Sequence, residues 1–170
     1  MDASARATAE ALMRAIKAEG DGHHFYIMAA KSSQDAKGRE VFERLAEEEL
    51  DHQRFLSVHY RSLLETGRID SAARLGPRAD LSGESPIFSE EIRGRLAEAH
   101  FEMSALSIGI QLELAAMGYY RDAAVKSDGP EVKRLFEELA DWEAGHYRAL
   151  LRQQEALRDD YWSGSGFSPF

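Results

Sequence analysis

The stretch LAEEELDH, residues 45–52, returns 94 residues later as LADWEAGH, residues 139–146. Both copies place a histidine three positions after a glutamate, as Glu49 with His52 and as Glu143 with His146. Residues three apart on an α-helix lie on the same face, so each pair can point at one spot. A carboxylate and an imidazole beside an apolar stripe cost free energy unless something compensates them.

The repeat continues through both halves of the chain without a gap. Matched core residues are expected of any two equivalent helical hairpins, but matched polar residues need another explanation. The pairs at this offset are Leu12 and Leu106, Ile16 and Ile110, Glu19 and Glu113, Tyr26 and Tyr120, Phe42 and Phe136, Leu45 and Leu139, Glu49 and Glu143, and His52 and His146.

Apolar periodicity predicts four helices, at about residues 3–32, 37–66, 89–126 and 130–158. Ser89 is a favourable N-cap, and Pro130 suits a first helical turn. The first and third connections are short, so each helix pair forms an antiparallel hairpin, whereas the middle one is long enough to run along the bundle. The sequence therefore predicts an all-α, ferritin-like antiparallel four-helix bundle of two repeated hairpins, with a long crossover between helices two and three.

We expect this bundle to occupy residues 1–158 and an aromatic tail to follow at residues 159–170, DDYWSGSGFSPF. The tail has the composition to pack on the bundle, to contact another subunit or to dock to a partner.

Composition excludes several classes of site. The chain of 170 residues contains no cysteine, which excludes disulfides, thiol catalysis and every cysteine-ligated metal centre. The net charge of −9 makes nucleic acid an unfavourable partner and suits attraction of cations, although solubility alone also explains an acidic surface. No long apolar run or signal sequence is present, so we expect no membrane association and a cytoplasmic location.

The depth of the acidic residues in the bundle follows from the hairpin geometry. Glu19 and Glu49 each lie about 15 residues from the turn near residue 34, and Glu113 and Glu143 lie equally far from the turn near residue 128. Residues equidistant from a short turn come level in an antiparallel pair, so the four carboxylates should meet at one depth.

Four clustered carboxylates would repel each other and lose hydration, whereas two divalent cations would cancel their charge. One glutamate from each of two helices and Glu-x-x-His from each of the other two is the ligand arrangement of di-iron and di-manganese bundles. Oxygen and nitrogen donors suit iron or manganese without excluding zinc or cobalt. The alternative is that these residues lie on solvated helix faces.

Two tyrosines follow the same pattern. Tyr26 and Tyr120 lie two helical turns after Glu19 and Glu113, where each could hydrogen-bond a ligating carboxylate or serve as an ordinary core tyrosine. His23 lies one turn after Glu19, either as an extra ligand or proton donor or as a partly exposed histidine without a role. No role is assigned to the remaining histidines, His24, His59 and His100.

Together these residues resemble the ferritin-like domain of rubrerythrins, over about residues 5–158. The resemblance implies two iron ions bridged by Glu49 and Glu143. It implies terminal ligation by Glu19, Glu113, His52 and His146. The family chemistry is reduction of hydrogen peroxide, or reaction with dioxygen, by the di-iron(II) state.

The sequence departs from that family in two respects. Rubrerythrins carry a rubredoxin domain whose cysteine-bound iron supplies electrons, and this chain has no cysteine, so a separate electron donor is expected. Rubrerythrins also carry an extra glutamate one turn after the third-helix ligand, where this chain has Ala116. The remaining six ligands look more like those of a plain oxygen-reacting di-iron protein.

We therefore expect a non-haem di-iron oxidoreductase that reacts with peroxide or dioxygen, protects against oxidative stress and forms a homodimer or higher oligomer. A ferroxidase or iron-handling protein, or a non-enzymatic metal-binding bundle, is the alternative. Manganese could replace iron, and zinc could occupy the site after purification.

Overall fold

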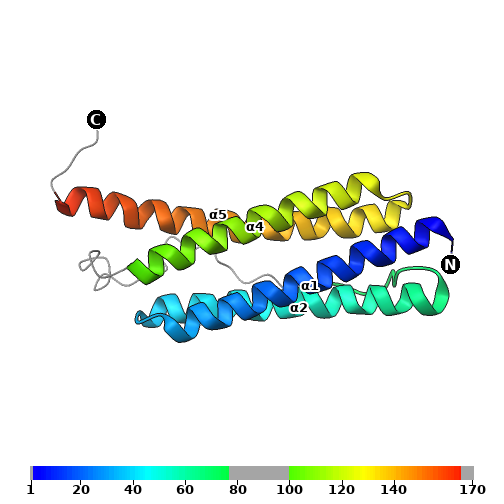
Figure 1. Cartoon of the computed structure of the whole chain (residues 1–170), viewed down its shortest axis with the longest axis horizontal. Coiled ribbons are helices and arrows are strands. Elements are labelled where there is room, and N and C mark those ends of the chain that lie inside the picture. Colours follow the sequence, from blue (N-terminus) through cyan, green and yellow to red (C-terminus); the bar gives the residue numbers. More distant parts are fainter. Residues whose placement is uncertain (1, 77–99, 166–170) are drawn as a thin grey trace.

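The computed structural model describes residues 2–76 and 100–165, and four long helices account for most of them. Within these residues there is no strand. The helices are α1 (Ala3–Ser32), α2 (Ala36–Thr66), α4 (His100–Lys126) and α5 (Pro130–Ser165), as Figure 1 shows. The predicted all-α class is confirmed.

Local capping explains where the first two helices begin and end. The carboxylate of Asp2 accepts a hydrogen bond from the Ala5 amide at 2.8 Å, and that of Asp35 accepts one from the Gly38 amide at 2.7 Å. Helix α2 is capped after Thr66 by Gly67, whose φ of 75° lies in the left-handed region that glycine adopts without strain.

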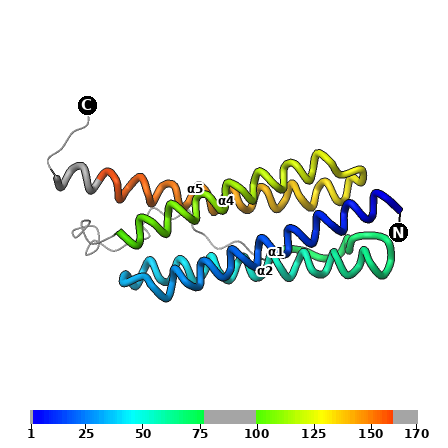
Figure 2. Tube along the Cα trace, viewed as in Figure 1, coloured from blue at the N-terminus to red at the C-terminus, as the bar shows by residue number. Residues whose placement is uncertain are grey.

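The helices pack as two antiparallel hairpins, α1 with α2 and α4 with α5 (Figure 1). Figure 2 shows that α2 and α4 run in the same direction, so α4 begins at the opposite end of the bundle from the end of α2. The predicted bundle topology is confirmed. The helix start predicted at Ser89 lies outside the described residues.

Helix α5 continues to Ser165 and thus passes the end predicted near Arg158. The Gly- and Ser-rich composition suggested a tail from residue 159, but residues 159–163 contain no glycine or proline that would stop a helix.

Among the described residues, no helix is both long enough and apolar enough to cross a membrane.

The apolar core consists of two clusters, and repeat partners lie in opposite ones. Phe42 belongs to the first cluster and its partner Phe136 to the second, and Tyr26 and Tyr120 are divided in the same way. The sequence repeat is therefore a pseudo-two-fold symmetry of the bundle. The polar repeat residues lie along the helices between these clusters.

A buried carboxylate joins the two hairpins at one end of the bundle. Glu102, in the first turn of α4, is 2% exposed. Its Oε1 accepts hydrogen bonds at 3.2 Å from the hydroxyl of Ser33 and from the amide of Gln34, both in the turn between α1 and α2.

We predict that Glu102→Ala lowers the free energy of unfolding by about 1–3 kcal/mol, because it leaves the Ser33 and Gln34 donors without their acceptor. Urea unfolding followed by circular dichroism measures the change. Glu65→Ala, at an exposed position of α2, is the control and should have little effect. Equal losses in both variants would contradict a role for Glu102 in joining the hairpins.

Candidate metal centre

All six residues predicted as ligands meet inside the bundle, and none is more than 4% exposed. Helices α1 and α4 supply one glutamate each, and α2 and α5 supply one glutamate and one histidine each. The ligand atoms form two groups, each within 4.8 Å: Glu19, Glu49, His52 and Glu143, and Glu49, Glu113, Glu143 and His146. Glu49 and Glu143 belong to both groups, as expected of bridging ligands.

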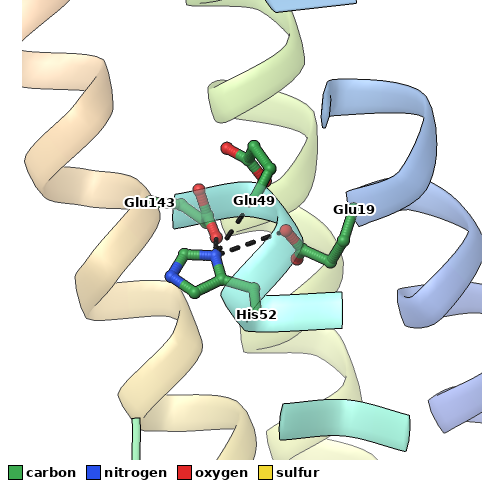
Figure 3. A group of neighbouring side chains, drawn as sticks. All are labelled: Glu19, Glu49, His52 and Glu143. Atoms are coloured by element: carbon green, nitrogen blue, oxygen red, sulfur yellow. Dashed lines mark hydrogen bonds and ion pairs between the residues drawn. The ribbon is translucent and has the colours of Figure 1, made fainter. Parts of the chain in front are cut away.

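The first group surrounds Nδ1 of His52, as Figure 3 shows. This nitrogen lies 3.3 Å from Oε2 of Glu19, 3.1 Å from Oε1 of Glu143 and 3.9 Å from Oε2 of Glu49. Three carboxylates from three different helices therefore face one ring nitrogen.

The second group has the same form about Nδ1 of His146. This nitrogen lies 3.4 Å from Oε1 of Glu49, 3.6 Å from Oε2 of Glu113 and 3.2 Å from Oε2 of Glu143. The two imidazole rings are nearly parallel, with their centroids 5.7 Å apart and an interplanar angle of 16°. The centre is thus two similar half-sites related by the repeat.

Several of the predicted ligand atoms are not satisfied by hydrogen bonds within the protein, and two metal ions would satisfy them. Both carboxylate oxygens of Glu143 and Nδ1 of His146 are buried without a hydrogen-bond partner within the described residues. Buried polar atoms in proteins are nearly always satisfied, so their exceptions need an explanation. Two divalent cations would supply it, because they would accept these lone pairs and balance four carboxylate charges.

The two tyrosines bond across the repeat. The Tyr26 hydroxyl on α1 donates a hydrogen bond to Oε1 of Glu113 on α4, and the Tyr120 hydroxyl on α4 donates one to Oε1 of Glu19 on α1. Both tyrosines are fully buried. Each hydroxyl holds one oxygen of a predicted terminal ligand and leaves the other oxygen facing a histidine.

The rubrerythrin family model matches residues 10–103 and 104–163, which together make up most of the chain. The chain belongs to the rubrerythrin family. A search of curated proteins and a search of solved structures each returned no match. Family membership and the buried Glu/His cluster together give this rubrerythrin relative a site compatible with a di-iron centre.

Two contacts of this rubrerythrin-family centre were not predicted from the sequence. Glu48 on α2 contacts the outer nitrogen of His146, and Trp142 on α5 makes a T-shaped ring contact with His52. Both follow from their positions next to ligands Glu49 and Glu143, but only the packing of α2 against α5 shows which histidine each one meets.

The remaining histidines lie outside the ligand set. Nδ1 of His23 lies 2.7 Å from the carbonyl oxygen of Ala46, within hydrogen-bond distance, and His23 belongs to neither ligand group. His59 is buried, makes a T-shaped ring contact with Phe55, and has its pKa lowered by burial. His59 has no repeat partner, so the sequence pattern did not indicate that it is buried.

Without metal, Glu19, Glu113 and His146 hold their protons to a higher pH than usual, whereas Glu143 loses its proton at a lower pH. Burial raises the pKa of Glu19 well above its ordinary value of 4.5, and Glu49 and Glu143 raise it further; the same causes raise the pKa of Glu113. Burial opposes charge on His146, but the facing carboxylates outweigh it and raise its pKa well above 6.5. Burial also acts to raise the pKa of Glu143, yet the two imidazoles hold it well below 4.5.

We predict that the metal-free protein loses stability as the pH rises from about 5 to about 8. Glu19 and Glu113 contribute stability that is complete below their unfolded pKa and lost as the pH rises through their raised folded pKa. His146 likewise contributes stability that is lost as the pH rises above its unfolded pKa of 6.5 and through its raised folded pKa. Glu143, with its lowered pKa, acts in the opposite sense only below about 4.5, outside this range.

Urea unfolding in chelator across this pH range measures the effect. The double variant Glu19→Gln, Glu113→Gln lacks both titrating carboxyls and should give a flatter profile. A wild-type profile that rises with pH, or one identical in the double variant, would contradict the prediction.

Proposed function

We propose that this protein is a non-haem di-iron oxidoreductase that reacts with dioxygen or hydrogen peroxide and takes electrons from a separate donor. The observation that carries the proposal is the closed set of four glutamates and two histidines, buried at one depth and contributed by all four helices. Two reduced iron ions would supply the electrons for reduction of the oxidant.

The protein residues would hold and orient that metal pair. Glu49 and Glu143 would bridge because each belongs to both ligand groups, and Nδ1 of His52 and of His146 would each complete one half-site. The Tyr26 and Tyr120 hydroxyls fix the terminal carboxylates and hold a proton next to the centre.

A pocket between α1 and α4 provides a route for the oxidant. It has a volume of about 280 Å³ and reaches Glu19, Glu49 and Glu113. The rest of its wall is mostly apolar and combines small or aliphatic residues with Asp21 and three tyrosines; the small or aliphatic residues are Ala18, Gly22, Leu112, Ala115 and Ala116. Such a lining suits uncharged dioxygen better than a strongly hydrated molecule.

Ala116 connects this pocket to the family comparison. The rubrerythrin pattern has a glutamate at this position, which swaps with a histidine as the irons change oxidation state, whereas the alanine here forms part of the pocket wall. We therefore favour dioxygen over peroxide as the oxidant.

We predict two iron ions per chain, and a di-iron(II) form that dioxygen oxidises at least as fast as hydrogen peroxide does. Metal analysis of protein purified without chelator and anaerobic stopped-flow mixing with each oxidant measure both quantities. Faster oxidation by peroxide would contradict the preference for dioxygen and indicate a peroxidase. Retention of iron far beyond two per chain in a large assembly would indicate iron storage, and absence of bound metal would leave a non-enzymatic bundle.

We further predict that Ala116→Leu slows oxidation of the di-iron(II) form by dioxygen, because the larger side chain fills the pocket next to Glu113. The iron content should stay at the wild-type value, which separates blocked access from lost metal. Gly118→Leu is the matched control, since Gly118 is exposed on the same helix and a Cβ at this position would have no atom of another residue within 4 Å. Unchanged oxidation in Ala116→Leu would rule out this pocket as the route.

A further inference from the structure

The two half-sites differ at a pair of equivalent positions whose side chains contact the two histidines. Glu48 precedes Glu49, and its repeat partner Trp142 precedes Glu143. Each of these two side chains crosses between α2 and α5 to the histidine of the other helix. The two positions are therefore equivalent in geometry, but one carries a carboxylate and the other an indole.

At the His146 half-site the outer ring nitrogen has a charged partner. Nε2 of His146 lies 2.8 Å from Oε2 of Glu48, a buried residue whose side chain is 11% exposed. A carboxylate can only accept a hydrogen bond, so Nε2 is the nitrogen that carries the proton toward Glu48, and Nδ1, which faces Glu49, Glu113 and Glu143, is the nitrogen left to bind a cation. An imidazole held in this way is both oriented and made a stronger metal ligand.

At the His52 half-site no such partner exists within the described residues. Nε2 of His52 is buried without a hydrogen-bond partner, and Trp142 meets the ring edge to face, with centroids 5.0 Å apart and an angle of 87°. An indole has a single N–H donor and no acceptor, so it cannot take the Nε2 proton and carries no charge.

The charge balance follows the same division. The bridging carboxylates Glu49 and Glu143 are shared, and each half-site adds one terminal glutamate and one histidine. Glu48 then adds a further buried carboxylate on the His146 side, where little water would screen its attraction for a cation.

We propose that Glu48 is a positioning residue that makes the two metal positions unequal, so that the His146 position binds a divalent cation first and more tightly than the His52 position. This inference rests on the proposed di-metal function but concerns only the order and affinity of loading.

Anaerobic titration of the metal-free protein with Co²⁺, followed by calorimetry and visible absorption, tests the proposal. We expect two steps whose affinities differ by about tenfold or more. His146→Ala should leave a single weak site, and His52→Ala a single site with the affinity of the tighter step.

Glu48→Gln should weaken the tighter step by about 10- to 100-fold and leave the weaker step unchanged. Glu48→Asp, which keeps the charge, should retain the order of the two steps. The matched control is Glu47→Gln, because Glu47 is the neighbouring glutamate on α2 and is exposed. Circular dichroism establishes that each variant is folded, and the wild-type and histidine-variant titrations decide the question if Glu48→Gln is not.

Equal affinities in the wild type, loss of the tighter step in His52→Ala, or the same weakening of both steps in Glu48→Gln would each overturn the inference and leave the di-metal centre intact. Failure of the wild type to bind any Co²⁺ would overturn the inference and the proposed function together.

Discussion

The structure depends on the electrostatic cost of placing four carboxylates in the middle of a helix bundle. Glu19, Glu49, Glu113 and Glu143 are all at least 95% buried, where like charges repel strongly and have lost their hydration. Their neighbours reduce this cost through two tyrosine hydroxyls and two imidazoles. Two imidazoles cannot balance four ionised carboxylates. The Glu143 oxygens and Nδ1 of His146, which make no hydrogen bond within the described residues, belong to the groups of atoms that could hold two cations.

Internal symmetry is what brings these groups together. The two members of each apolar repeat pair lie in different clusters, so Phe42 packs at one end of the bundle and Phe136 at the other. This arrangement places the repeated glutamates and histidines between the clusters, where all four helices contribute. The same residues that satisfy the core therefore fix the depth of the centre, and the pocket between α1 and α4 gives it an opening.

The repeat made most of this arrangement predictable. Spacing alone placed Glu49 and His52 on one helix face, and equal distances from the turns placed Glu19 level with them. Contacts between helices were harder to predict: Glu48 reads as one of three consecutive glutamates until α5 is packed against α2 and His146 meets it. The end of α5 was missed because composition around Gly164 suggested a tail, although nothing before it breaks the helix.

The crossed tyrosine bonds have an implication for the modularity of the chain. Because Tyr26 completes the environment of Glu113 and Tyr120 that of Glu19, neither hairpin holds a finished half-centre by itself. A half-length polypeptide carrying one hairpin would assemble such a centre only by self-association with a second copy. Because a single chain carries both copies, residues 48 and 142 can differ, whereas two identical polypeptides would carry the same residue at both positions.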